Sequence, residues 1–103
     1  MMEISYTAKY KKDLKRVLKS GVSVSEIDTV IRTIASSSKL PDKYRDHALT
    51  DDKHFKNCRE CHIRPNVLLV YRILNKNLVL ELLRIASHGD LFSTSLNDRL
   101  VFV

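Results

Sequence analysis

No apolar run in the 103-residue sequence comes near the ~20 residues that a helix needs to cross a membrane. The N-terminal stretch MMEISYTAKY also lacks the apolar core of a secretory signal. These two absences favour a cytoplasmic protein with no membrane partner. The sequence contains only two cysteines, and in a reducing cytosol two cysteines do not imply a disulfide.

Acidic residues are outnumbered. Eighteen Lys and Arg stand against 12 Asp and Glu, so the net charge is +6 and the sequence pI is about 9.5. Hydrophobic residues make up 44% and charged residues 29%, which is typical of one small globular domain. No internal repeat or second domain is visible. The basic charge favours an anionic partner, either nucleic acid or an acidic protein, and a merely well-solvated basic surface is an equal alternative.

The first part of the chain has the pattern of a short strand followed by two amphipathic helices. Residues 3–6 alternate polar and apolar side chains. Gly21 is placed to end the first helix, and Ser23 with Glu26 forms a capping box that begins the second. Helical spacing gives each helix an apolar face, made of Tyr10, Leu14, Val17 and Leu18 in the first and of Val24, Ile27, Val30, Ile31 and Ile34 in the second. We expect a helical hairpin with a lysine-rich outer face.

The second part has the pattern of strands. Residues 39–54 show no periodicity and predict a long loop that carries His47. Strands are expected at residues 55–63, 67–74 and 78–85, joined by turns. The prediction is an α+β fold, with an N-terminal strand and a helical hairpin packed on an antiparallel β-meander. Residues 93–103 are expected to be a tail that adds a strand, docks on the core or is mobile.

A period of two along the strands predicts which side chains share a face. It places Glu60 and His62 together on the first strand of the meander. On the last strand it places Leu82 with Arg84, and Leu83 with Ile85 on the opposite face.

The segment from Cys58 to His62, CRECH, matches the C-x-x-C-H pattern of haem attachment. Haem attachment of this kind needs an exported protein, and no export signal is present. Within a strand, Cys58 and Cys61 point to opposite faces because their separation is odd. A zinc site lacks a second cysteine pair. We therefore expect no metal and no cofactor, and we interpret the cysteines as small apolar fillers.

Three histidines, His47, His62 and His88, come from separate segments, and Arg84 lies close to the last of them. RNA can be cut without a metal when a base removes the 2′-OH proton and an acid protonates the leaving 5′-oxygen. Histidine suits both proton transfers, and arginine suits the charge that grows on the phosphate. From spacing alone, histidines scattered without a common site are an equal alternative.

The runs YRDHAL, RECHIRPNVLLVY and LLRIASHGDLF, all within residues 44–92, resemble the YafQ branch of the RelE/ParE toxins. The resemblance implies one RelE-like toxin domain at residues 1–92, with residues 93–103 beyond it as a tail. It also implies a ribosome-dependent mRNA endonuclease of a type II toxin–antitoxin pair. Its partners would be mRNA in the ribosomal A site, ribosomal RNA and an acidic cognate antitoxin that inhibits it.

The same resemblance implies roles for individual residues. His88 would be the general acid, while His47 and His62 would handle the 2′-OH or steady the phosphate. Arg84 would stabilise the transition state, and Phe92 would pack against a base.

Three further positions bear on this resemblance. Glu60 stands where an acidic residue is usual and is a secondary candidate. Asn66 and Val67 replace the family's usual Asp-Trp, which removes a carboxylate from the site. The segment between Leu49 and Phe55 lacks the usual Gly and Trp. The alternative function is a non-nuclease toxin of the gyrase-poisoning kind, or an antitoxin-binding module, on the same fold.

Overall fold

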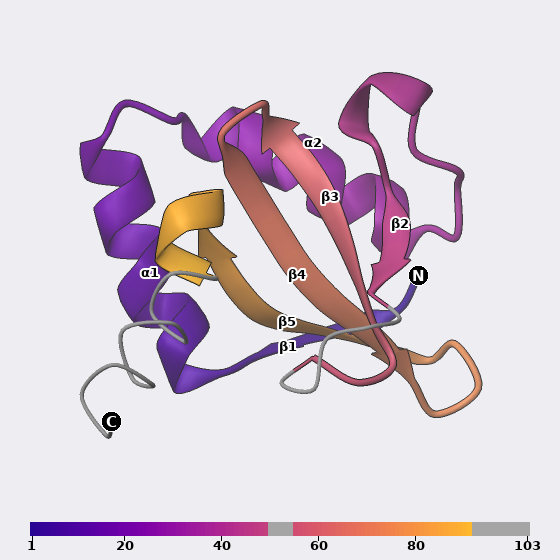
Figure 1. Cartoon of the computed structure of the whole chain (residues 1–103). Helices are drawn as coiled ribbons and strands as arrows, with labels where there is room; N and C mark the ends of the chain where they lie inside the picture. The colour runs from indigo at the N-terminus through magenta and orange to yellow at the C-terminus, as the bar shows by residue number, and fades with distance from the viewer. Residues whose placement is uncertain (50–54, 92–103) are drawn as a thin grey trace.

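A computed structural model describes residues 1–49 and 55–91 of the chain (Figure 1). The fold is α+β, as predicted, with two helices packed against one face of a five-stranded sheet. A helical turn at residues 88–91 follows the last strand. The elements in chain order are β1 (Glu3–Tyr6), α1 (Ala8–Lys19), α2 (Val24–Ala35), the 3₁₀ turn η1 (Asp42–Tyr44), β2 (His47–Leu49), β3 (Cys58–Arg64), β4 (Val67–Leu74) and β5 (Val79–Ala86).

The strands lie in the order β1-β5-β4-β3-β2. The meander of β3, β4 and β5 is antiparallel, as predicted, and β1 joins its edge in parallel with β5. At the other edge, β2 pairs antiparallel with β3. The prediction of an unstructured loop over residues 39–54 is wrong for η1 and β2, because elements of three residues are too short to show a period. The remainder of that loop, residues 50–54, lies outside the described residues.

The structure confirms the predicted end of α1 and the predicted start and end of α2. The Thr7 side chain caps α1 by accepting a hydrogen bond from the Tyr10 amide at 3.0 Å. Gly21 follows α1 with φ +105°, a conformation that glycine adopts without a Cβ clash. Both bonds of the capping box are present at α2, between Ser23 and Glu26. In the described part of the chain, no helix has the length and apolar character to cross a membrane.

The sheet separates two apolar clusters. The larger one fills the space between the helices and the sheet and includes Val30, Leu69 and Tyr71. The smaller one lies on the opposite face and includes Leu68 and Val70. We call this second side the open face of the sheet. Fully buried residues alternate between the two faces along β4, which is the pattern expected of a central strand.

A bulge in β5 changes the predicted facing of side chains. Val70 pairs with Arg84, but the next residue, Tyr71, pairs with Leu82, so Leu83 is the extra residue. Leu82 and Ile85 therefore both reach the helix-side cluster, while Leu83 packs on the open-face cluster. The prediction that Leu82 shares a face with Arg84, and Leu83 with Ile85, is wrong because one inserted residue shifts the period of two.

Candidate active site

The register of the sheet aligns three of the predicted site residues. His47 on β2 lies opposite Glu60 on β3, Glu60 lies opposite Val70 on β4, and Val70 lies opposite Arg84 on β5. Residues directly opposite each other in antiparallel strands lie on the same face. Val70 belongs to the open-face cluster, so the row runs across the open face. His62 follows Glu60 by two positions and shares that face, as predicted.

His47, Glu60 and His62 form a compact cluster. The Nε2 atoms of His47 and His62 lie 3.5 Å and 3.9 Å from Glu60 Oε1, and the two ring centroids are 6.4 Å apart. Glu60 is only 5% exposed, and its Oε2 has no hydrogen-bond partner among the residues that the structure describes. A buried carboxylate is costly unless it is compensated, and the two imidazoles compensate it when their Nε2 atoms carry a proton.

Backbone carbonyls fix the orientation of both imidazoles. His47 Nδ1 lies 2.7 Å from the Arg45 carbonyl oxygen, and His62 Nδ1 lies 3.2 Å from that of Pro65. A carbonyl can only accept, so each Nδ1 carries a proton. The Nε2 nitrogens that face Glu60 are therefore the ones that gain or lose a proton. This arrangement suits proton transfer to and from a bound substrate.

Arg84 is held in an ion pair with Asp13 of α1. Its Nε and Nη2 donate to the Asp13 carboxylate at 2.5 Å and 3.0 Å, and the Ile85 amide donates to the same carboxylate at 3.2 Å. Both side chains are largely buried, with 17% of Arg84 and 6% of Asp13 exposed. The hydrogen bonds that Arg84 donates to the Asp13 carboxylate are the main reason that the pKa of Arg84 is raised. The residue predicted to meet the phosphate is thus already paired.

Asp13 was missed by the sequence prediction, although a signal for it exists. It lies three positions after Tyr10 and four before Val17, so it falls on the buried face of an otherwise lysine-rich helix. An acidic residue on such a face has to find a partner. The pairing of β5 with β1 ends at Leu82. Beyond it, the Thr7 hydroxyl donates to the Leu83 carbonyl, and the Asp13 carboxylate accepts from the Ile85 amide, so these two side chains take over the edge of β5.

His88 begins the helical turn at residues 88–91, directly after β5. The turn is capped by Ser87, whose hydroxyl oxygen accepts from the Asp90 amide at 3.1 Å. Two residues before His88, Ala86 lies opposite Leu68, which in turn lies opposite His62. The topology therefore places exposed His88 at the same end of the sheet as His62.

Asn66 and Phe92 were the remaining predicted site residues. Asn66 is exposed in the turn between β3 and β4, and it lines a cavity of about 220 Å³ together with Asp13, Ser87 and Asp90. It therefore lies at the same end of the sheet as His88. Phe92 lies outside the described residues.

The two cysteines are free and buried. They lie on opposite faces of β3, as predicted. Cys58 packs in the open-face cluster and Cys61 in the helix-side cluster. Burial raises the pKa of the Cys61 thiol to about 12. Over residues 1–49 and 55–91, the structure contains no group of three or more His, Cys, Asp or Glu side chains that could hold a metal ion.

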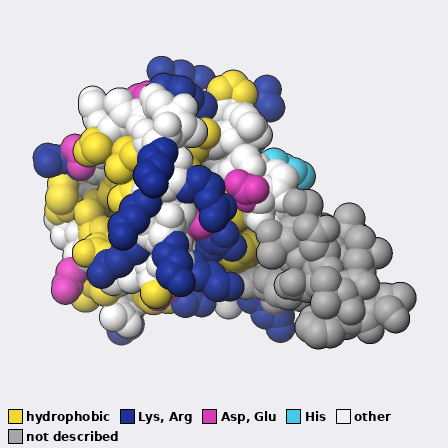
Figure 2. Space-filling view, turned by 90° about the vertical axis from the view of Figure 1, so that its left-hand side faces the viewer, with side chains coloured by type: hydrophobic (Ala, Val, Ile, Leu, Met, Phe, Trp, Pro, Cys, Tyr) yellow, Lys and Arg dark blue, Asp and Glu magenta, His cyan; other side chains and the backbone are white. Residues whose placement is uncertain are grey.

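The basic residues of α1 form a continuous charged surface. Figure 2 shows lysine and arginine side chains gathered on the side of the molecule that α1 covers. The exposed residues of α1 that contribute are Lys9, Lys11, Lys12, Lys15, Arg16 and Lys19. The surface is suited to bind a polyanion.

Comparisons with known proteins agree with this fold. The family model of YafQ, a bacterial toxin of type II toxin–antitoxin systems, matches residues 2–93. The chain is 29% identical over 91 residues to the mRNA interferase toxin YafQ of Escherichia coli K12. The aligned region covers 87% of this chain and 95% of that protein.

Solved structures of toxins are also similar. A metal-bound toxin from Helicobacter pylori is 38% identical, with a TM-score of 0.81, and the match covers 89% of this chain and 100% of that one. A chain of the E. coli DinJ–YafQ complex is 26% identical, with a TM-score of 0.76, and the match covers 89% and 99%. The chain therefore belongs to the YafQ family of toxins from bacterial type II toxin–antitoxin systems.

Proposed function

We propose that this toxin is an mRNA interferase, an endoribonuclease that cuts mRNA in the ribosomal A site in the cytoplasm. The observation that carries the proposal is the cluster of Glu60 between His47 and His62, whose Nε2 atoms face the same carboxylate oxygen. Fixed Nδ1 atoms leave both Nε2 atoms as the exchangeable sites. Two imidazoles in this state, with a carboxylate to hold the proton, are suited to remove the 2′-OH proton of RNA.

The other steps fall to residues at the end of β5. His88 is the general acid that protonates the leaving 5′-oxygen. Arg84 stabilises the charge on the phosphate with the N–H groups that Asp13 does not use, since a guanidinium has five and Asp13 accepts two of them. Phe92 packs against a base. These side chains supply acid, base and cation, so the proposed reaction needs no metal.

The partners follow from charge and from the relatives. The ribosome positions the mRNA, which lets a small domain cut selectively. The basic surface of α1 contacts ribosomal RNA. One relative is named in a DinJ–YafQ toxin–antitoxin complex. An acidic antitoxin is accordingly expected to bind this chain and to compete with RNA for its basic surface.

The test is primer extension on mRNA in a translating extract, with and without ribosomes. Cleavage that occurs only with ribosomes supports the proposal. Intact mRNA together with blocked replication would favour the gyrase-poisoning alternative. A chelator selective for transition metals, used at constant magnesium, examines the metal-free chemistry. Loss of cleavage on chelation, restored by one metal, would refute it.

Single-turnover cleavage on programmed ribosomes tests the roles. Replacing His88 by Ala should lower the rate by about 10²–10⁴, the usual worth of one proton-transfer group. Arg84→Ala should lower the cleavage rate by a comparable factor, because the charge on the phosphate loses its stabilising cation. His62→Ala should be severe and Asn66→Ala mild, since an amide takes no proton in this reaction. A His88→Ala protein that cuts at the wild-type rate would remove the acid assignment.

A further inference from the structure

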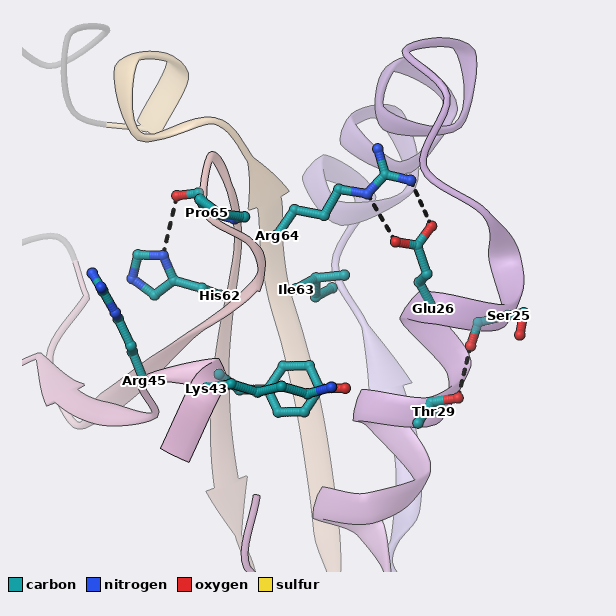
Figure 3. A pocket seen from close by; sticks show the side chains of 10 residues that line it. Ser25, Glu26, Thr29, Lys43, Arg45, His62, Ile63, Arg64 and Pro65 are labelled. Carbon is teal, nitrogen blue, oxygen red and sulfur yellow. Dashed lines mark hydrogen bonds and ion pairs between the residues drawn. The ribbon is translucent and has the colours of Figure 1, made fainter. Parts of the chain in front are cut away.

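A groove on the helix side of β3 adjoins the His47–Glu60–His62 cluster. It lies between α2, η1 and the end of β3, as Figure 3 shows. Its volume is about 580 Å³, within the ~300–1,000 Å³ of ordinary ligand sites. We call it the α2–β3 groove. His62 forms part of its wall, so the groove and the proposed catalytic cluster share a residue.

The wall of the groove is rich in cations and hydroxyls. Lys43 and Arg45 come from η1 and the residue after it, and Ser25 and Thr29 come from α2. Arg64 also lines the groove, but its charge is compensated: its Nε and Nη2 both lie 2.8 Å from Glu26 carboxylate oxygens.

Arg45 differs from the other arginines that the structure describes. There are seven of them, and six form ion pairs with carboxylates: Arg16, Arg32, Arg59, Arg64, Arg72 and Arg84. Within the described part of the chain, Arg45 is exposed and has no acidic partner. Its guanidinium is therefore available to an anion with all of its N–H groups, while Asp13 already accepts from two N–H groups of Arg84.

The backbone at Arg45 is unusual and well fixed. Its φ is 50° and its ψ 42°, in the left-handed region that side-chain-bearing residues seldom adopt. Its carbonyl accepts the proton of His47 Nδ1, and the next residue, Asp46, is held by Arg59 at 3.0 Å and by the Tyr71 hydroxyl. A costly conformation that its surroundings hold in place is characteristic of functional sites. This one ties the position of Arg45 to that of His47.

We propose that the α2–β3 groove binds the RNA strand next to the cleaved bond, with the guanidinium of Arg45 on a backbone phosphate. This inference rests on the proposed function and adds a phosphate-binding residue to it. A planar guanidinium matches the oxygens of a phosphodiester, and the hydroxyl groups of Ser25 and Thr29 line the opposite side of the groove. The groove shares His62 with the histidine cluster, so a strand that passes His62 can contact both. RNA is favoured over an acidic antitoxin segment because His62, a residue of the proposed catalytic cluster, lines the groove.

The experiment measures single-turnover cleavage on programmed ribosomes as a function of toxin and salt concentration. Arg45→Ala should raise the half-saturating toxin concentration about tenfold or more, the usual worth of a hydrogen bond to a charged group, and leave the maximal rate near the wild-type value. A plot of the logarithm of the affinity against the logarithm of the salt concentration should become less steep by about 0.7, because one phosphate contact is lost. Arg45→Lys should retain most of the affinity.

Lys76→Ala is the matched control. Lys76 is exposed, has φ 55° and carries one positive charge, but it lies in the turn at the opposite end of β4. An equal weakening by Lys76→Ala would show a general charge effect and overturn the proposal. A fall in maximal rate with unchanged half-saturation would also overturn it, since that result indicates a displaced His47.

A second measurement does not depend on cleavage. A 2′-O-methyl RNA oligonucleotide, which cannot be cut, is titrated into the isotope-labelled wild-type chain. The amide resonances of residues 25–29 and 43–45 should shift, and Arg45→Ala should abolish the shifts. Absence of the shifts overturns the groove assignment even if the toxin cuts mRNA. Loss of antitoxin binding in Arg45→Ala, with normal cleavage and RNA shifts, would assign the groove to the antitoxin instead.

Discussion

Replacing Asp13 by Ala should destabilise the fold strongly. The Asp13 carboxylate is the acceptor for Arg84 Nε and Nη2 and for the Ile85 amide. The Arg84 side chain is 17% exposed and Ile85 is fully buried, so neither donor reaches enough water to replace the lost partner. Removing one member of a buried ion pair usually costs about 3–5 kcal/mol, because a charge is left uncompensated. An orphaned buried amide contributes about 1–3 kcal/mol of such a loss.

The control is Asp28→Ala, the same substitution in the neighbouring helix. Asp28 forms an ion pair with Arg32 at 2.7 Å, but its side chain is 51% exposed and that of Arg32 is 70% exposed. Exposed pairs at this helical spacing contribute about 0.3–0.5 kcal/mol. The two substitutions remove the same group, and only its burial and partners differ.

Urea unfolding followed by circular dichroism measures both variants. Asp13→Ala should lower the free energy of unfolding by about 3–5 kcal/mol, and its melting temperature should fall by at least about 12 °C at ~4 °C per kcal/mol. The double variant Asp13→Ala/Arg84→Ala should be less destabilised than the sum of the two single variants, since it removes the unpaired charge. An Asp13→Ala protein within about 0.5 kcal/mol of Asp28→Ala would refute the reasoning.

Three further predictions concern residues outside the proposed catalytic chemistry. Hydrogen bonds from Arg64 and Ser23 lower the pKa of Glu26 from 4.5 to about 2. The contribution of the ionised Glu26 carboxylate to the free energy of unfolding should therefore be complete above pH 4.5 and lost as the pH falls through about 2. A midpoint near 4.5 in an NMR titration of Glu26 in the wild type would contradict this. Cys61, whose pKa burial raises to about 12, should react with thiol reagents only after unfolding, and fast labelling of the native protein would contradict its placement. Gly21→Ala should lower the free energy of unfolding by about 1 kcal/mol because φ is +105°, and an unchanged urea midpoint would show that the turn adapts.

The sequence was most informative where one local rule decides the structure. The capping box at Ser23 and the apolar spacing predicted the two helices, except that Val24, predicted on the apolar face of α2, is 66% exposed. The continuous apolar run predicted β4 with the bounds that the structure has, residues 67–74. In each case the signal is contained within one helix or one strand.

Features that depend on distant contacts were not predicted. The three residues of β2 have no period of their own, and they form a strand because β3 supplies an edge. The bulge at Leu83 leaves no mark in a continuous apolar run, yet it decides which side chains reach the helix side. Glu60 was only a secondary candidate, because nothing in the sequence indicates that its carboxylate lies between two imidazoles. The pairing of β2 with β3 decides that position.

The parallel pairing of β1 with β5 has a consequence for how the protein is made. Glu3 pairs with Val79, and the Thr7 hydroxyl that caps α1 donates to the Leu83 carbonyl, so the start of the domain is completed by β5, the last strand that the structure describes. Contacts so far apart in sequence form late, and during synthesis the chain emerges from its N-terminus. We expect that a nascent chain without β5 has neither a stable sheet nor a working site. On the proposed function, the toxin would be harmless to the ribosome that is making it until translation has passed this strand.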